Sequence, residues 1–259
     1  MLVLIGLTAA QAGCGGQDDD GSKDPFTAVR QGQTPAAARK AAPRWEGLAR
    51  LAGSGARKER LLISRRALQW RIRWRCSSGA IAFAVAPRDR SGLASASGQC
   101  PGSGTTNWSQ RGPVRLDVTA AGPWRAVVEQ QFDSALHEPP LAGMRSTRAR
   151  VLGRGRFYRM EGKGGGKALL YRLPTGRLAL RLQSFRTAPT TGMFVWLSKA
   201  PRPTTSKQVI ATQPIRLRGL KSTLGDQNYL LPRRLGRDAV RSVVIWYKPT
   251  GTAYIAAAL

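Results

Sequence analysis

The longest alternation of hydrophobic and polar positions lies in the first half of the chain, from Leu68 to Cys76. Every second residue of this stretch is hydrophobic, and arginine or glutamine fills the positions between them. A period of two is typical of a β-strand with one face buried and the other in solvent. The triplet Ser77-Ser-Gly79 then predicts a turn into a second strand at Ile81, so we expect a hairpin here.

Further strands are expected in both halves of the chain. In the first half, two more apolar runs flank a turn at Ala121-Gly-Pro123. In the last third, hydrophobic and polar positions alternate again from Leu178 to Gln183, and two apolar runs follow at Phe194 and Val243. The pattern predicts an all-β fold class, with two small β-sandwich-like domains in tandem.

We expect these domains to span residues 45–134 and 166–259, joined by a linker over 135–165 that contains two consecutive prolines. A chain of 259 residues is long enough for two such cores. Residues 14–44 lack apolar periodicity and are rich in Gly, Gln and Ala, which predicts a flexible tether. Residues 1–13 are mostly apolar, carry no charged side chain and are too short to span a bilayer, which predicts a signal peptide.

The three cysteines fit an exported protein. Ala12 and Gly13 immediately before Cys14 resemble a bacterial lipobox, in which the cysteine sulfur receives a diacylglyceryl lipid and anchors the protein to the outer face of the cell membrane. The alternative is a secreted protein without an anchor. Outside the cytoplasm, Cys76 and Cys100 are expected to form a disulfide. The alternative for this pair is two buried free thiols.

The formal net charge of +28 raises the question of anionic partners. Basic residues are spread over both predicted domains and no recognisable nucleic-acid motif accompanies them, so we expect no specific nucleic-acid binding. The sharpest basic stripe is the polar face of the first strand, formed by Arg71, Arg73 and Arg75. It is either a docking surface for an anionic lipid, envelope polymer or protein, or a solvent face whose charge protects a strand edge.

Candidate catalytic residues are few. The single histidine, His137, lies in the predicted linker, so neither a His-pair metal site nor a Ser-His-Asp triad can be built within one domain. The carboxylates in or near the second domain are Glu161, Asp226 and Asp238, and the position of Asp226 is that of a turn residue. We therefore expect no catalytic residue, no metal site, no cofactor and no enzymatic activity.

Strand and turn motifs of the last third follow one another in a fixed order: Leu178–Phe185, Phe194–Ser198, Leu224–Tyr229 with Pro232 behind it, and Val243–Pro249 closing on Ala256–Leu259. This series resembles the DM-thirteen electron-transfer domain, a small extracytoplasmic β module. The resemblance implies a β fold, an address outside the cytoplasm and a redox role that would rest on a thiol. In the family a cysteine commonly follows the Ile-Trp pair, whereas Tyr247 occupies that position here and can form neither a disulfide nor a thiolate ligand.

Together these patterns predict an exported, lipid-anchored cell-surface protein whose DM-thirteen-like domain acts as a binding or scaffold module. Its expected partners are the membrane, through the anchor, and an anionic envelope polymer or protein. The alternative is a redox accessory protein that transfers electrons at the cell envelope, and Tyr247 weighs against it.

Overall fold

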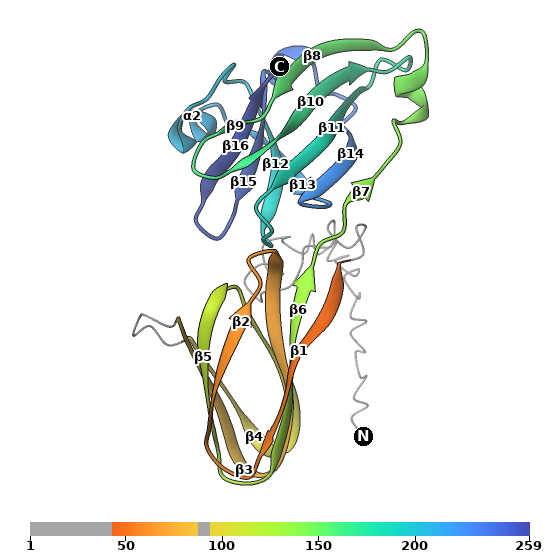
Figure 1. Cartoon of the computed structure of the whole chain (residues 1–259). Helices are drawn as coiled ribbons and strands as arrows, with labels where there is room; N and C mark the ends of the chain where they lie inside the picture. Colours follow the sequence, from red (N-terminus) through yellow and green to blue (C-terminus); the bar gives the residue numbers. More distant parts are fainter. Residues whose placement is uncertain (1–42, 88–93) are drawn as a thin grey trace, which may run out of the picture.

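The computed structural model describes residues 43–87 and 94–259. They form two units that follow one another along the chain (Figure 1). β-Strands make up most of the described residues, so the all-β fold class is confirmed. The expected signal peptide, most of the tether and Cys14 lie outside the described residues.

The first unit is built on one long, bent strand. Its antiparallel sheet has the order β1-β6-β3-β5-β2, with β4 on the other edge of β3. The first half of β3 pairs with β6 and the second half with β5, so β3 serves two layers that face each other across a core. The strands are β1 (Arg44–Gly53), β2 (Arg57–Ile63), β3 (Ala67–Pro87), β4 (Ala94–Trp108), β5 (Gly112–Ala120) and β6 (Trp124–Phe132).

β3 bends between Cys76 and Gly79, where the sequence predicted a hairpin turn. That prediction is wrong, because β3 continues through the bend as one strand and keeps β4 beside it. The pairing register shifts at this point, as in a β-bulge. Gly79 has a φ of +73°, and a Cβ there would lie 2.6 Å from the Cβ of Ala121. Glycine therefore lets the strand change layers without ending.

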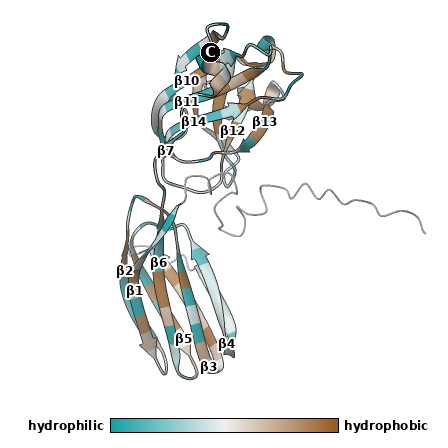
Figure 2. Cartoon of the chain, turned by 90° about the vertical axis from the view of Figure 1, so that its right-hand side faces the viewer, coloured by the Kyte–Doolittle hydropathy of each residue, from teal (hydrophilic) through white to brown (hydrophobic). Residues whose placement is uncertain are grey.

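The core of the first unit lies between the two layers. The alternation predicted from the sequence buries Trp70 and Ile72 on one layer and Phe83 on the other, and the strands of this unit show alternating apolar and polar bands (Figure 2). Trp74 packs against the backbone of β4, since a Cβ at Gly104 would lie 2.6 Å from its ring. The small residues of β4 thus leave room for a large side chain of β3.

The second unit is a sandwich of two five-stranded sheets. Its core is formed by leucines of one sheet and valines and isoleucines of the other, including Leu180, Leu182, Val195 and Ile245. One sheet has the order β7 (Leu136–His137), β14 (Leu224–Leu230), β11 (Leu178–Thr187), β10 (Gly164–Arg172), β8 (Arg150–Arg156). The other has the order β13 (Ile215–Gly219), β12 (Met193–Ser198), β15 (Ser242–Tyr247), β16 (Thr252–Ala258), β9 (Tyr158–Arg159).

The stretch expected as a linker, residues 135–165, contributes β7, β8 and β9 to these sheets. β8 pairs with β10, and β9 pairs with β16. β7 and β9 are two residues long, and β8 carries glycine and arginine at most positions, so none shows a hydrophobic period. These strands are held by their neighbours rather than by their own pattern.

A short helix of six residues, α2 (Ser206–Ala211), packs on the outer face of the second sheet. It begins with a capping box, in which Thr205 accepts a hydrogen bond from the Gln208 amide and Gln208 reaches back to the Thr205 amide. Val209 is buried against Trp196 and Trp246. Among the described residues, no helix combines the length and the apolarity needed to cross a membrane.

Candidate functional site

The outer face of one layer of the first unit is strongly basic. In this layer β1, β6 and β3 lie side by side, and the register places Arg50 and Arg73 on either side of Val127. Two residues further along the strands, Arg125 lies directly opposite Arg75. All four arginines are exposed. Because alternate residues of a strand share a face, four guanidinium groups from three strands gather on the same side of the sheet.

These four arginines line a groove of about 850 Å³, hereafter the arginine groove. Ser103 and Thr105 of β4 line its wall, and no carboxylate of the described residues does. A second hollow, of about 330 Å³, shares Arg75 and Arg125 with the groove and continues along the strands to Ser77. The hollowed surface is therefore elongated along the strands, with its arginines at the groove end.

The predicted stripe of Arg71, Arg73 and Arg75 divides into two parts. Arg71 lies over the Trp45 ring, 3.9 Å from its centroid, and its Nε donates to a Glu129 carboxylate oxygen at 2.7 Å. Arg73 shares that oxygen at 3.1 Å while remaining more than half exposed. Arg75 has no ion pair among the described residues. Arg71 is thus held by its own sheet, and Arg75 faces solvent with its charge uncompensated.

Sequence reasoning missed Arg50 and Arg125, which complete the groove. Arg50 lies in β1 and Arg125 at the start of β6, far from β3 in the sequence, and only the strand register brings them beside Arg73 and Arg75. Arg125 follows the predicted turn and precedes an apolar position, so an outward orientation could have been inferred. Its pairing with β3 could not, because several strand orders satisfy the same pattern.

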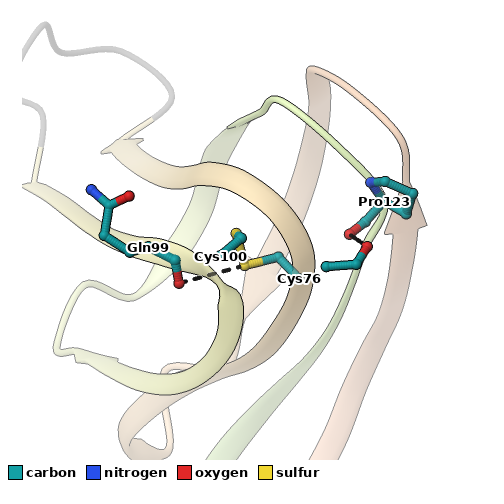
Figure 3. The surroundings of a disulfide bond; sticks show 5 residues. Cys76, Gln99, Cys100 and Pro123 are labelled. Carbon is teal, nitrogen blue, oxygen red and sulfur yellow. Dashed lines mark hydrogen bonds between the residues drawn. A yellow bond between two sulfur atoms is a disulfide. The ribbon is translucent and has the colours of Figure 1, made fainter.

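The disulfide between Cys76 and Cys100 is confirmed, and it joins β3 and β4 at their bends (Figure 3). The two Cα atoms are 5.4 Å apart, and the cysteines are 24 positions apart in the sequence. Closing a loop of that size stabilises the folded state by about 3.5 kcal/mol in the chain-entropy model. Cys76 also lines the hollow that extends the arginine groove, so the bridge fixes one end of the cationic surface.

Tyr247, where the resemblance led us to expect a cysteine, ends β15 and is half-buried. Its ring meets Tyr254 of β16 edge to face, with the centroids 6.0 Å apart. On the other face of the sheet, the preceding Trp246 stacks on Trp196 with centroids 4.0 Å apart. The position is occupied by aromatic packing, and a phenol there supplies no thiol chemistry.

Tyr247 and Tyr254 lie near the junction of the two units. Arg111, in the turn between β4 and β5, donates from Nε to the Ala67 carbonyl at 2.8 Å within its own unit. Its Nη2 also donates to the carbonyl of Pro189 in the second unit. Burial lowers the pKa of the Arg111 guanidinium, and the two tyrosines act in the opposite direction. Arg111 thus connects the first unit to the edge of the second that carries the substituted position.

A second junction contact follows β6. The Asp133 carboxylate accepts hydrogen bonds from the amide and the hydroxyl of Thr223, at 2.7 and 2.9 Å. Beside it, the Ser222 hydroxyl donates to the Ser134 carbonyl at 2.9 Å. The connection between the two units is therefore tied to the second unit by side chains as well as by the backbone.

The motif Leu224–Tyr229 supplies a buried polar network rather than a catalytic pair. The Arg181 guanidinium contacts the Asp226 carboxylate at 2.5 Å and the Asn228 side-chain oxygen at 2.9 Å. The Lys221 ammonium donates to both carboxylate oxygens of Glu138, at 2.6 and 2.8 Å. Each carboxylate is paired with a cation of the same domain, an arrangement that fixes the local structure.

The remaining sequence-predicted residues are not brought together. His137 is exposed in β7, and residues 43–87 and 94–259 contain no cluster of three or more His, Cys, Asp or Glu side chains that could hold a metal ion. The position predicted for lipid attachment, Cys14, is outside the described residues.

The geometry defines a two-unit, disulfide-bonded all-β protein with a groove lined by four arginines on its first unit. Residues 159–259 match the family described as "Electron transfer DM13". The second unit thus carries a DM13 domain, and the resemblance read from the motif order is confirmed.

Other comparisons add little. A search of curated proteins found no match. Among solved structures, tripeptidyl peptidase 2 aligns with 83% of this chain and 23% of its own length, at 12% identity and a TM-score of 0.25. The Bacillus licheniformis lipase BlEst2 in its propeptide form aligns with 82% of this chain and 43% of its own length, at 10% identity and a TM-score of 0.20. The chain therefore spans less than half of either structure, and likenesses this weak carry no inference.

Proposed function

We propose that the protein is an exported, lipid-anchored binding module that holds an anionic polymer of the cell envelope in the arginine groove. The observation that carries this proposal is the convergence of Arg50, Arg73, Arg75 and Arg125, from three strands, on one groove without a lining carboxylate. Guanidinium groups present planar sets of N–H donors that match carboxylate and phosphate oxygens. Ser103 and Thr105 add hydroxyl donors on the same wall.

The shape of the cationic surface favours a chain-like ligand. The groove and the adjoining hollow together reach from Arg73 to Ser77 along β3. At about 3.3 Å per residue, this stretch is about 13 Å long. Both hollows lie open on the face of the sheet, so a chain-like ligand can extend past either end of them. A linear polyanion can place successive charges on the arginine rows and continue beyond the groove.

The proposed location rests on three features. Ala12-Gly13-Cys14 supplies the lipidation motif after an apolar leader, and residues 15–44 supply the tether. The Cys76–Cys100 disulfide agrees with an oxidising compartment outside the cytoplasm. A flexible tether of that length has an end-to-end distance of about 30 Å, enough to hold the folded units clear of lipid headgroups. A protein anchored to the outer face of the membrane would hold its basic face close to the anionic polymers of the envelope.

The proposal gives the chain no catalytic step. His137 is exposed on a two-residue strand, and Glu138 and Asp226 are each held by a basic side chain. A scaffold role needs none of these groups to change protonation. The DM13 domain would then serve as the rigid partner of the binding domain, fixed to it through Arg111 and Asp133.

Fluorescence anisotropy tests the proposal, with labelled poly(glycerol phosphate) as the probe and the purified full chain as the binder. The triple variant Arg50→Ala/Arg75→Ala/Arg125→Ala should bind about threefold to 150-fold more weakly, because exposed ion pairs contribute about 0.2–1 kcal/mol each. The matched control removes three exposed arginines outside the groove, Arg60, Arg65 and Arg66. An equal loss of affinity in both variants would show that net charge alone attracts the polymer, and it would refute the arginine groove as the binding site.

A redox accessory role is the second candidate, favoured by the family description and by the Trp196–Trp246 stack at 4.0 Å. Absorbance spectra and metal analysis of the purified protein separate the two roles. Our proposal expects neither a haem spectrum nor stoichiometric metal. Either finding would favour electron transfer through the DM13 domain.

A further inference from the structure

A second pocket lies in the DM13 domain, between the edges of its two sheets. β13 is an edge strand of one sheet, and β14 is flanked by β7 only at Gly225 and Asp226, so both strands expose an edge beyond that point. Between them lies a cavity of about 520 Å³, hereafter the edge pocket. This volume is within the range of small-molecule sites, about 300–1,000 Å³.

The rim of the edge pocket is cationic. Arg216 and Arg218 reach it from β13, and Arg177 reaches it from the turn between β10 and β11. None of the three forms an ion pair among the described residues, and no carboxylate lines the pocket. A fourth cation, Lys221, lies in its wall but already binds Glu138. The pocket therefore has three arginines without a carboxylate partner, although Arg216 lies over the Trp196 ring at 5.0 Å and Arg177 donates to the Leu231 carbonyl at 2.6 Å.

The remainder of the lining is largely apolar. Leu141, Leu217, Leu230 and Pro232 contribute to it. Leu230 is 48% exposed, one of the few large hydrophobic side chains left in solvent among the described residues. A ligand that buried this surface would gain about 25 cal/mol per Å² of apolar area. The pocket thus combines an anion-binding rim with an apolar wall.

The exposed edge of β14 does not offer the pocket to an added strand. The Asn228 amide donates to the Glu138 carboxylate at 2.7 Å, and the Asn228 carbonyl accepts from the Lys221 ammonium at 2.7 Å. The Asn228 side chain also donates to the Pro139 carbonyl at 2.7 Å. Because the Asn228 backbone groups are already satisfied, a small molecule fits the β14 side of this pocket better than an added β-strand.

We propose that the edge pocket binds a small soluble organic anion, a carboxylate or phosphate carried on an apolar chain or ring. The anionic group contacts Arg216 and Arg218 at the rim, and the apolar part covers Leu230 and Leu217. The site is separate from the arginine groove and lies in the other domain. Binding here would allow a small ligand to act on the same protein that holds the polymer.

Titration calorimetry of the full chain with octanoate tests this site. Octanoate should bind saturably, whereas octanol, which lacks the charge, and acetate, which lacks the apolar chain, should bind at least about tenfold more weakly. Arg216→Ala/Arg218→Ala should weaken octanoate binding by a similar factor. The matched control is Arg154→Ala/Arg156→Ala, which removes two arginines at the same spacing from β8, the edge strand at the far side of the other sheet.

Leu230→Ser provides a variant on an exposed position, so its fold should be kept. It should weaken octanoate binding and leave acetate binding unchanged. Three outcomes would overturn the proposal: no saturable octanoate binding, equal loss in the β8 control, or octanol binding as tight as octanoate. Binding to anionic phospholipid vesicles that depends on Arg216 and Arg218, without octanoate binding, would also overturn it, because the ligand would then be a membrane headgroup.

Discussion

Arg71 and Arg75 lie on the same face of β3 but have different roles in our account. Arg71 is fixed between Glu129 and Trp45, and Arg75 faces the groove without an ion pair. Arg75→Ala should therefore lower the affinity for poly(glycerol phosphate) about twofold to fivefold, the effect of one exposed contact. Arg71→Ala should mainly lower the free energy of unfolding. Anisotropy and chemical denaturation measure the two effects, and a larger affinity loss for Arg71→Ala would contradict this division.

Tyr229 shows how a buried side chain links stability to pH. Its hydroxyl accepts from the Lys221 amide at 3.2 Å and donates to the Gln227 side chain at 2.8 Å. Burial raises the pKa of Tyr229 well above its usual value near 10. The folded state then holds this proton more tightly than the unfolded state, so the stabilisation is complete below about pH 10 and is lost above it.

Tyr229→Phe should remove these buried hydrogen bonds and cost about 1–3 kcal/mol at neutral pH. Above pH 10 the difference from the wild type should shrink, because the wild-type protein loses the stabilisation that the variant already lacks. Denaturant unfolding at pH 7 and above pH 10 measures this. A difference that stays constant or grows with pH would show that the Tyr229 proton does not contribute.

The strand β4 depends on glycine where Trp74 crosses it. A Cβ at Gly104 would meet the Trp74 ring at 2.6 Å, whereas a Cβ at Gly55 would meet nothing within 4 Å. Gly104→Ala should lower the free energy of unfolding by about 1–3 kcal/mol, the usual cost of overpacking. Gly55→Ala should change it by less than about 0.5 kcal/mol. Urea unfolding compares them, and equal stability of the two variants would refute the packing of Trp74 on β4.

At the level of elements, the sequence predicts those strands whose burial repeats along one segment. Hydrophobic and polar residues alternate from Leu68 to Cys76 because each face of this stretch keeps the same surroundings along its length. This strand was therefore predicted from the sequence. In the sequence, the bend at Gly79 looks like a hairpin turn because glycine and serine are common in both structures. Only the continuous pairing of β3 with β4 shows that the strand bends instead of ending. β8 and β9 lack a pattern of their own, since partner strands supply their stabilisation.

The candidate sites divide in the same way. The arginines of β3 could be read from one strand, and the Cys76–Cys100 bridge from the cysteine count. Arg50 and Arg125 could not, because register between distant strands places them. The edge pocket was also beyond reach, since it forms between β13 and β14, which belong to different sheets. The sequence pattern thus identifies the polar face of a single strand, whereas the pairing of distant strands decides which polar faces come together in one site.

For the whole molecule, the proposal requires attachment at Cys14. Cys14→Ala should move the protein from the membrane fraction to the soluble fraction, because an apolar leader followed by lipidation is the only attachment that we assign. Metabolic labelling with palmitate should mark the wild type and not the variant. If the Cys14→Ala variant stayed in the membrane fraction, lipid attachment at Cys14 would be refuted. Polymer binding in the arginine groove is tested separately by the anisotropy experiment.

The most direct test of the central claim is an NMR spectrum of the arginine side-chain Nε–H groups in the full chain, recorded with and without poly(glycerol phosphate). We expect the resonances of Arg50, Arg73, Arg75 and Arg125 to shift on addition of the polymer, and those of Arg150, Arg154 and Arg156 on β8 to stay in place. Equal shifts of the groove arginines and the β8 arginines, or shifts confined to the DM13 domain, would show that the polymer does not bind in the groove.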